Sequence, residues 1–523
     1  MVIIMSSAYC SSDFDLEFGK IPPSFLPLGG KRLYEYQISL FKNLKDKIIL
    51  TVPQDFHINQ QEIKKINSLH AELFYIPSNF NLGEALIYII NMNSPVRENL
   101  YILYGDTYFD SLEFDDNSLV ISRAKENYRW EYLFNKNKLN YKIKNNLKRE
   151  DRLILSGFIS IKKPYFLIKC IIENQYSFLG GLKKYSDKYP FECYINNSWS
   201  DFGLITNYFH SKKNISTQRA FNNLKFCSDG YIIKSSSWSD KIQAEINWFE
   251  NFPKELDIHI PRFKIQNNTA YKIEYLHNNT LAELFVFGSL PYYVWENIFT
   301  SLSFFLKKLH KYKNNLNKNI MFNYNEKTLD RLNSLQYKES IMGVNIDFLD
   351  KKYYFNDKQP ISLQEILNEI NSYLYEDNDK YCLIHGDFCF SNIMFDFRSG
   401  FVKVFDPRGM DFRKNITIYG DKDYDYAKLA HSVLGLYDFI VFDFTECIIK
   451  EDKIFFIINI NNNISKIQEK FLKYFNINKN ICSIVIHLFI SMLPLHADNK
   501  NRQKALFANI FRLYFYFKDK GLL

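Results

Sequence analysis

Residues 382–409, CLIHGDFCFSNIMFDFRSGFVKVFDPRG, place acidic and amide side chains within an apolar run. Asp387 is followed by Asn392, and Asp406 ends the strand-like stretch FVKVF. Phosphoryl transfer needs a carboxylate near the attacking hydroxyl and metal ligands for the phosphates of the nucleotide. Asp387 can be that carboxylate. Asn392 and Asp406 offer the oxygen ligands that Mg²⁺ prefers, if a hairpin brings them together. The segment therefore predicts a phosphotransfer site.

A second candidate acid ends a predicted strand in the first part of the chain. The segment NLYILYGD ends in Asp106. Before it, the strand-like segments MVIIM, KIILTV and AELFYIP alternate with the helix-like segments KRLYEYQISLFKNL, NQQEIKKINSLH and LGEALIYIINM. This alternation predicts βαβ units and a largely parallel sheet. Ligands of such sheets bind at the carboxyl ends of strands, where Asp106 would lie.

The pattern along the chain changes twice more. Strand-like segments such as SLVISRA, WEYLF and LILSGFISI follow residue 118, and a second change comes after residue 213. FCSDGYIIKSSS then predicts a hairpin that turns at Asp229-Gly230. SDKIQAEINWFENF predicts an amphipathic helix capped by Ser239 or Asp240. Beyond residue 281 the chain is mainly helical. These changes predict three parts, residues 1–213, 218–280 and 281–523.

Composition limits the function classes. The chain has 523 residues, 46% of them hydrophobic and 24% charged, which is typical of globular proteins with more than one domain. The net charge of +8 is spread along the chain without a basic run. The pattern therefore favours anionic small molecules over nucleic acid as partners. It does not indicate an oligomeric state.

Cysteine spacing and apolar run lengths indicate the compartment. The eight cysteines lie far apart and form no CxxC pair, so neither a zinc site nor a redox motif is predicted. The first residues, MVIIMSSAYC, lack the features of a signal peptide, and no apolar run suggests a membrane span. We expect a cytoplasmic protein with reduced thiols.

HGDFCFSNIMFD followed by VKVFDPRG resembles the aminoglycoside phosphotransferase and choline kinase group of small-molecule kinases. The resemblance implies an α+β, two-lobed, protein-kinase-like fold for the second half of the chain. It implies Asp387 as the catalytic base and Asn392 and Asp406 as Mg²⁺ ligands, with ATP as a substrate. His385 would be a structural member of the catalytic loop, and Asp425 in DKDYDYAKLAHS would hold that loop in place.

The same resemblance implies an upstream nucleotide site. Lys234 in GYIIKSSS would hold the nucleotide phosphates as part of the catalytic set, and Glu245 in KIQAEINWF would orient it. Glu274 to Leu276, in YKIEYL, would form the hinge that grips the adenine. For Arg408 two roles stay open. It could hold a substrate phosphate, or it could brace its loop by pairing with a carboxylate.

The first 213 residues resemble the sugar-phosphate nucleotidyltransferases, which have an α/β, doubly wound, glycosyltransferase-A-like fold. The segments that carry the resemblance are PPSFLPLGGKRLYEYQI, NLGEAL, LYGDTYFD, SGFISI and WSDFGLITNYF. The resemblance implies that Asp106 and Asp201 together bind Mg²⁺ and that Asn81 and Gly83 lie beside the nucleobase. CTP or another nucleoside triphosphate would be the substrate.

This half departs from that family at its phosphate loop. The family carries a Gly-rich loop with an arginine, followed by a Pro-Lys pair, and these cations offset phosphate charge. Here the loop reads SSAYCSSDFDLEFGKIPPS, with Phe14 in place of the arginine and Ser24 in place of the lysine. Of the loop glycines only Gly19 remains. The nearby cations that could substitute are Lys20, Lys31 and Arg32.

These observations support a fused enzyme as the first hypothesis. The kinase half would phosphorylate a sugar, polyol or amino alcohol, and the other half would join the product to a nucleotide for surface polysaccharide biosynthesis. Fusion would raise the effective concentration of the shared intermediate. The alternatives are a kinase with an inactive transferase-like scaffold, a non-catalytic nucleotide-binding regulator and an antibiotic-resistance kinase.

Overall fold

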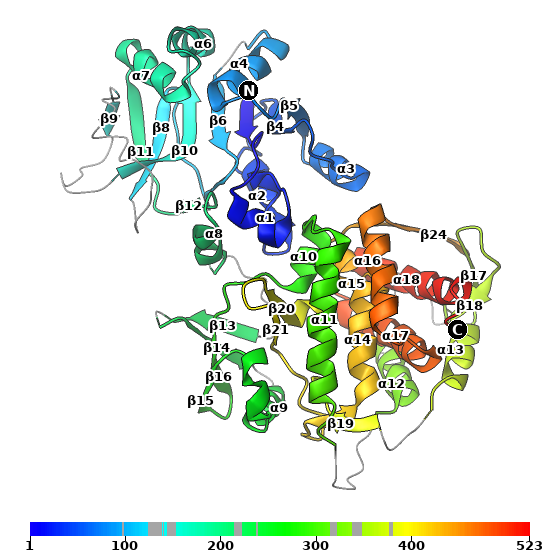
Figure 1. Cartoon of the computed structure of the whole chain (residues 1–523). Helices are drawn as coiled ribbons and strands as arrows, with labels where there is room; N and C mark the ends of the chain where they lie inside the picture. Colours follow the sequence, from blue (N-terminus) through cyan, green and yellow to red (C-terminus); the bar gives the residue numbers. More distant parts are fainter. Residues whose placement is uncertain are drawn as a thin grey trace. The chain divides into compact units, whose positions relative to one another are not determined.

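The chain forms two compact units, Met1–Ser216 and Thr217–Leu523. Figure 1 draws the first in blue to teal and the second in green to red. In this computed structural model the described residues are 1–96, 99–123, 139, 141–143, 153–213, 222–227, 229–236, 239–313, 322–336, 348–375 and 380–523. The expected strand WEYLF, residues 130–134, lies outside them.

An eight-stranded sheet forms the centre of the N-terminal unit, in the order β5-β4-β1-β6-β10-β8-β11-β9. β10 is antiparallel to both of its neighbours, and the other adjacent pairs are parallel. From β1 the chain winds outward through β4 and β5, then crosses to β6 on the other side of β1. This is a doubly wound sheet, as predicted. The strands are β1 (Val2–Met5), β4 (Ile48–Pro53), β5 (Ala71–Ile76), β6 (Leu100–Tyr104), β8 (Ser118–Arg123), β9 (Tyr141–Ile143), β10 (Leu153–Ile161) and β11 (Phe191–Ile195).

Helices cover this sheet, and two short ribbons flank it. The apolar faces of α4 (Leu82–Met92), α6 (Pro164–Glu173) and α7 (Phe178–Lys188) pack in one core with alternate residues of the strands. The other helices are α1 (Ser12–Phe18), α2 (Leu33–Ser39), α3 (Gln60–Ser68) and α8 (Ile205–Lys212). The ribbons pair β2 (Pro27–Leu28) with β3 (Lys31–Arg32) and β7 (Thr107–Tyr108) with β12 (Ser200–Asp201). The expected loop after β1 in fact contains α1.

The second unit begins with a four-stranded antiparallel sheet in the order β13-β14-β16-β15. β13 (Asn222–Phe226) and β14 (Tyr231–Ser236) form the predicted hairpin, and Gly230 supplies its left-handed turn residue with φ +81°. α9 (Ser239–Glu250) follows, with Ser239 as its first described residue. β15 (Phe263–Asn267) and β16 (Ala270–Glu274) complete this smaller lobe.

The larger lobe is mainly helical and surrounds the catalytic segment. Its helices are α10 (Leu281–Phe287), α11 (Tyr292–Leu309), α12 (Tyr324–Gln336), α13 (Leu363–Ser372), α14 (Lys422–Val433), α15 (Tyr437–Val441), α16 (Asn462–Tyr474), α17 (Lys479–Met492) and α18 (Lys500–Asp519). The stretch Lys479–His496 has the length and apolarity of a membrane span, but most of it is buried in this lobe.

Strands in the larger lobe form one sheet and two hairpin-like pairs. The sheet has the order β18-β17-β24-β23, which the predicted helical pattern did not include. Its strands are β17 (Lys352–Phe355), β18 (Ile361–Ser362), β23 (Thr445–Lys450) and β24 (Lys453–Ile458). β19 (Tyr381–Leu383) pairs with β22 (Tyr419–Asp421), and β20 (Ile393–Asp396) pairs with β21 (Phe401–Val404). These last two pairs frame the catalytic segment, and the unit is two-lobed as predicted.

Candidate functional site

Asp425 of α14 anchors the loop that carries Asp387. The two oxygens of Asp425 accept hydrogen bonds from the backbone amides of His385 (3.0 Å) and Gly386 (2.8 Å). His310 Nε2 lies 3.2 Å from the same carboxylate. Asp425 is fully buried, so these donors replace the water that its carboxylate would otherwise bind. The predicted roles of Asp425 and of His385 agree with this geometry.

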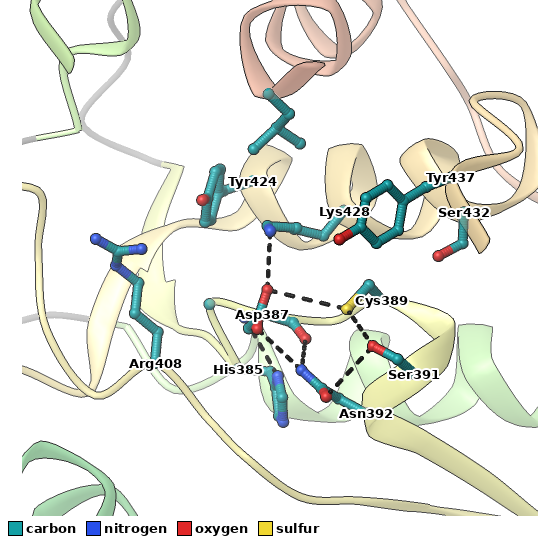
Figure 2. A network of polar contacts seen from close by, with 12 residues as sticks. His385, Asp387, Cys389, Ser391, Asn392, Arg408, Tyr424, Lys428, Ser432 and Tyr437 are labelled. Carbon is teal, nitrogen blue, oxygen red and sulfur yellow. Dashed lines mark hydrogen bonds and ion pairs between the residues drawn. The ribbon is translucent and has the colours of Figure 1, made fainter. Parts of the chain in front are cut away.

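Asp387 lies between a cation and an amide. Lys428 Nζ is 2.8 Å from Oδ1, and Asn392 Nδ2 donates to Oδ2 at 2.9 Å. Figure 2 shows Lys428 and Asn392 approaching Asp387 from opposite sides. The side chain of Asp387 is 39% exposed, so a substrate can reach it. Burial disfavours charge on Lys428, but Asp387 outweighs that effect and raises the pKa of the ammonium. The ammonium of Lys428 is therefore charged at neutral pH.

The β20–β21 hairpin brings Asp406 back to Asn392. Asn392 directly precedes β20, and the amide of Phe405, just after β21, donates to its carbonyl at 3.2 Å. Asp406 follows in the left-handed region, with φ +56°. Few non-glycine residues adopt this backbone conformation, and such residues are frequent at functional sites. The hairpin thus produces the juxtaposition that the spacing predicted.

Lys234 of β14 joins the two lobes. Its Nζ lies 2.8 Å from Glu245 Oε2 and 2.7 Å from Asp406 Oδ1. Tyr271 also donates to Glu245 Oε2, at 2.7 Å. Burial raises the pKa of Glu245, whereas at Asp406 the attraction of Lys234 outweighs burial and lowers the pKa. The predicted lysine, glutamate and metal aspartate are therefore one connected set.

The helix that carries Glu245 also contacts the catalytic segment directly. Trp248 Nε1 donates to the carbonyl of Ile384 at 2.7 Å. A Cβ on Gly409 would lie 2.1 Å from the carbonyl oxygen of Ala244, and Gly409 has φ +64°. Only glycine permits this approach of the loop after Asp406 to α9.

Arg408 braces its own loop. Its Nε donates to the carbonyl of Met410 (2.9 Å) and its Nη2 to that of Asp411 (3.4 Å). Gly386 allows the close approach, because a Cβ there would lie 2.7 Å from Arg408 Cβ. Arg408 thus braces its loop through backbone carbonyls and not through the predicted carboxylate, and its contact with a substrate phosphate stays a prediction. No ion pair of Arg408 with a carboxylate occurs within the described residues.

The predicted hinge follows β16. Tyr275 N donates to the carbonyl of Gly230 at 2.9 Å, and the chain then leads through Leu276 into α10. Glu274 accepts a hydrogen bond from the amide of Arg262 at 3.1 Å. Glu274 and Leu276 thus lie on the link between the lobes, and their contact with adenine stays a prediction.

The oxygens beside Asp387 fit a magnesium ion. Asn392 uses Nδ2 on Asp387, and its Oδ1 has a contact with the Ser391 hydroxyl at 3.5 Å. One oxygen of Asp406 pairs with Lys234, and the side chain is 35% exposed. Across the described residues no group of three or more His, Cys, Asp or Glu could hold a metal by itself. The oxygens of Asn392 and Asp406 fit Mg²⁺, which takes one or two protein oxygens and completes its shell with phosphates and water.

In the N-terminal unit the structure brings Asp106 and Asp201 together. β7 pairs with β12, which places Asp201 opposite Thr107. A Cβ on Gly203 would lie 2.8 Å from Asp106 Oδ2 and 3.2 Å from Asp201 Oδ1, so both oxygens adjoin one point. Asp106 follows β6, which lies next to β1 at the point where the sheet winding reverses. The two carboxylates therefore adjoin one place at the carboxyl end of β6, where both would hold one ion directly or through a water.

The same pair has perturbed electrostatics. Burial, followed by the charge of Asp201, raises the pKa of Asp106 to about 7. Burial and the charge of Asp106 likewise raise the pKa of the Cys10 thiol in the loop after β1. Repelling acids of this kind gain stability from a bound cation. The pair thus fits Mg²⁺, and metal binding there stays a prediction.

Phe14 and Ser24, which stand where the resemblance implies an arginine and a lysine, are both buried in the core. Phe14 is fully buried, and its ring contacts those of Phe18 and Tyr208 at 6.5 and 5.8 Å between centroids. Ser24 is also buried: its amide donates to Ser6 Oγ at 3.0 Å and its hydroxyl to the carbonyl of Gly105 at 3.3 Å. Ser24 therefore ties the ends of β1 and β6 together.

The three nearby cations differ in what they contact. Arg32 is buried and bonds to Glu62 (2.7 Å) and to the carbonyl of Phe25 (2.6 Å), so it has a structural role. Lys20 lies over Tyr9 and Lys31 over Tyr36, and both are exposed. Arg32 is therefore not a substitute for the missing arginine.

Asn81 and Gly83 begin α4. Asn81 caps the helix, since its side chain accepts from the amide of Glu84 at 3.0 Å. A Cβ on Gly83 would lie 2.1 Å from the carbonyl oxygen of Tyr176, so packing alone explains the glycine. Their contact with a nucleobase stays a prediction.

Sequence reasoning missed Lys428 and Lys327. Lys428 lies three residues after Asp425 on α14, so helical spacing alone could have placed both on the side facing the catalytic loop. Lys327 of α12 reaches Tyr424 of α14 at 3.1 Å, across almost a hundred residues of sequence. No sequence pattern predicts that contact.

Comparison with known proteins gives structural likenesses. No protein-family profile and no curated protein matches the chain. The nucleoside-diphosphate-sugar pyrophosphorylase from Vibrio cholerae RC9 is 12% identical and covers 41% of this chain and 100% of its own, with a TM-score of 0.32. The inositol-1-phosphate CTP transferase from T. maritima is 15% identical and covers 41% of this chain and 95% of its own, with a TM-score of 0.29.

A different class of solved structure matches a larger share. The GDP and kanamycin complex of APH(2")-IIia is 12% identical and covers 58% of this chain and 92% of its own, with a TM-score of 0.35. The topology itself shows a doubly wound α/β unit followed by a two-lobed α+β unit.

Proposed function

We propose that the C-terminal unit is an ATP-dependent phosphotransferase acting on a small molecule. The observation that carries this proposal is the connected set of Lys234, Glu245 and Asp406 beside Asp387 and Asn392. Each of these side chains comes from a different element, and together they supply the parts that phosphoryl transfer requires. A structural role alone does not explain a buried lysine held between two acids next to an exposed aspartate.

The roles follow from the positions. Lys234 holds the nucleotide phosphates, and Glu245 fixes its ammonium. Asp387 orients the acceptor hydroxyl and takes its proton, while Lys428 and Asn392 keep the carboxylate ionised and aimed. Asn392 and Asp406 would hold Mg²⁺, which offsets the phosphate charge when it is bound. Arg408 keeps the loop after Asp406 in shape.

The test is ADP release by the full chain with ATP and a panel of hydroxylated acceptors, with the product identified by mass spectrometry. We expect transfer that Asp387→Asn abolishes. ATP consumption that survives Asp387→Asn unchanged would contradict the proposal.

For the N-terminal unit we propose binding of a nucleotide or sugar phosphate at Asp106 and Asp201. The acid pair supports nucleotidyl transfer, giving a bifunctional enzyme that activates its own product for surface polysaccharide biosynthesis. The packed positions Phe14 and Ser24 support the alternative of a binding domain without transfer. Release of pyrophosphate from CTP or another nucleoside triphosphate with phosphorylated polyols distinguishes the two.

A further inference from the structure

Three cationic side chains lie around Asp387 on the side of the larger lobe. Lys428 comes from α14 and pairs with Asp387 at 2.8 Å. Lys327 comes from α12, and its Nζ donates a hydrogen bond to the Tyr424 hydroxyl at 3.1 Å. Arg408 comes from the loop after Asp406, and its guanidinium lies over the ring of Phe412, which contacts Tyr424. Three separate segments therefore contribute positive charge to one place.

Two aromatic rings gather these cations. Lys327 Nζ lies 3.9 Å from the centre of the Phe412 ring, and the Arg408 guanidinium lies 5.1 Å from it. Lys327 and Lys428 lie 5.1 and 5.9 Å from the ring of Tyr424. The two rings contact each other edge to face, at 5.4 Å between centroids. The rings thus offset part of the repulsion that would otherwise separate the three cations.

Carboxylates near these cations do not balance them. Asp387 pairs with Lys428, while the side chain of Asp411 accepts from the amides of Arg413 and Asn415. Lys327 forms no ion pair with a carboxylate in the part of the chain that the structure describes, and Arg408 donates to backbone carbonyls. An excess of positive charge therefore remains on this side of the aspartate.

The burial of Lys327 and the other nearby cations both affect its pKa. Burial, and then the nearby charges of Arg408, Lys428 and Arg331, lower the pKa of its ammonium well below the usual value. Proteins seldom keep a partly buried cation among other cations unless an anion joins them. The excess charge is thus typical of a binding site for an anionic group.

The nucleotide does not account for this charge. Of its predicted ligands, Lys234 pairs with Asp406, and Asn392 donates to Asp387 Oδ2, whereas Lys428 pairs with Asp387 Oδ1. Lys428 faces Asn392 across the aspartate (Figure 2). The acceptor hydroxyl must reach Asp387, so the rest of the acceptor extends toward the cations.

We propose that the phosphoryl acceptor itself carries an anionic group, a phosphate or a carboxylate, held by Lys327 and Arg408 while its hydroxyl faces Asp387. This rests on the proposed kinase function and specifies its substrate class. It disfavours amino alcohols and polycationic antibiotics, whose positive charge Lys327 and Arg408 would repel. In the transfer step the acceptor oxygen bonds to the γ-phosphorus, the bond to the β–γ bridging oxygen breaks, ADP leaves and the hydroxyl proton passes to Asp387.

The first experiment compares acceptors that share a hydroxyl and differ in charge. The pairs are glycerol with glycerol 3-phosphate, ribitol with ribitol 5-phosphate, and glucose with glucuronate; choline and ethanolamine are the cationic probes. We expect kcat/KM to be at least about 100-fold higher for the anionic member of the accepted pair, since the neutral member leaves the cations unpaired. Preference for a neutral or cationic acceptor would overturn the proposal and leave the kinase assignment standing.

The second experiment removes one charge. Lys327→Met should raise KM for the anionic acceptor about tenfold or more and change KM for ATP little, and Lys327→Arg should restore most of the loss. Lys470→Met is the matched control, since Lys470 also lies over an aromatic ring, Tyr292 at 5.3 Å, and pairs with Glu296. A rise in KM for ATP alone would assign the cation to the nucleotide and contradict the proposal.

Binding without turnover separates the two proposals. Glycerol 3-phosphate or inorganic phosphate should raise the Tm of the full chain, and Lys327→Met should reduce that rise while Lys470→Met retains it. Equal shifts in all three proteins would overturn the anionic pocket. Anion binding that depends on Lys327, without any consumption of ATP, would support the pocket and refute the proposed kinase.

Discussion

Both units have a pair of candidate metal-binding or catalytic acids, but only the C-terminal unit pairs its acids with lysines. In the kinase-like unit Lys234 and Lys428 pair directly with Asp406 and Asp387. In the N-terminal unit the carboxylates of Asp106 and Asp201 both adjoin Gly203, but buried Phe14 and Ser24 occupy the positions where the resemblance implies cations. A doubly wound sheet can therefore carry an acid pair without the cations that would offset phosphate charge beside it. Fold and chemistry vary independently, and each unit needs its own test.

The largest expected effect belongs to Asp387. Asp387→Asn should lower kcat for phosphotransfer by about 10²–10⁴-fold, because it removes the general base. Asp396→Asn is the matched control, since Asp396 serves only its own hairpin turn in the described structure. Asp106→Asn lies in the other unit and should leave phosphotransfer intact. Steady-state ADP release measures all three, and comparable losses for Asp106→Asn and Asp387→Asn would break the comparison.

The next largest effect is expected at Phe14, a buried ring at the position where the resemblance implies an arginine. Phe14→Ala should lower the free energy of unfolding of that unit by about 3–5 kcal/mol, since the ring is fully buried. Leu16→Ala on the same helix should change it by less than about 0.5 kcal/mol, because Leu16 is 68% exposed. Urea unfolding followed by circular dichroism measures both. A small effect of Phe14→Ala with gain of nucleotidyl transfer in Phe14→Arg would show that the loop is still a catalytic one.

A smaller loss is expected at Ser24. Ser24→Ala removes the hydroxyl that bonds to the carbonyl of Gly105 and should lower the free energy of unfolding by about 1 kcal/mol. Ser12→Ala is the control, because Ser12 is exposed. If Ser24→Ala abolished nucleotide binding and left stability unchanged, Ser24 would be a ligand-binding residue and the contrast between the units would weaken.

The last effect, spread over several pH units and thus small at each step, is a pH dependence of the N-terminal unit. The folded state raises the pKa of Asp106 to about 7, so between the ordinary aspartate range near pH 4 and pH 7 the folded state binds more protons than the unfolded state. Stability should therefore fall by about 5–10 °C of Tm as pH rises through this window. Asp106→Asn should flatten the dependence, and Mg²⁺ should restore stability at pH 8. A Tm that rises with pH in the wild type would contradict the buried acid pair.

Sequence predicted the parts of each unit that repeat a local pattern. The doubly wound sheet followed from alternating strands and helices, and the hairpin between Asn392 and Asp406 followed from their spacing. Helix α1 was missed because SSDFDLEF offers only Phe14 and Phe18 as an apolar pair within a polar segment. Lys327 was missed because its role depends on a contact between helices α12 and α14, which tertiary packing alone creates.

The contacts of α9 also bear on how the kinase-like unit can be controlled. Many enzymes of two-lobed design are switched off when the helix with the glutamate swings away from the lysine. Here the indole of Trp248 is bonded to Ile384 in the catalytic segment, and Ala244 rests against Gly409. Swinging the helix would break both contacts together with the Lys234–Glu245 pair. We therefore expect the proposed kinase to resist this form of switching, so that its flux follows the supply of its substrates.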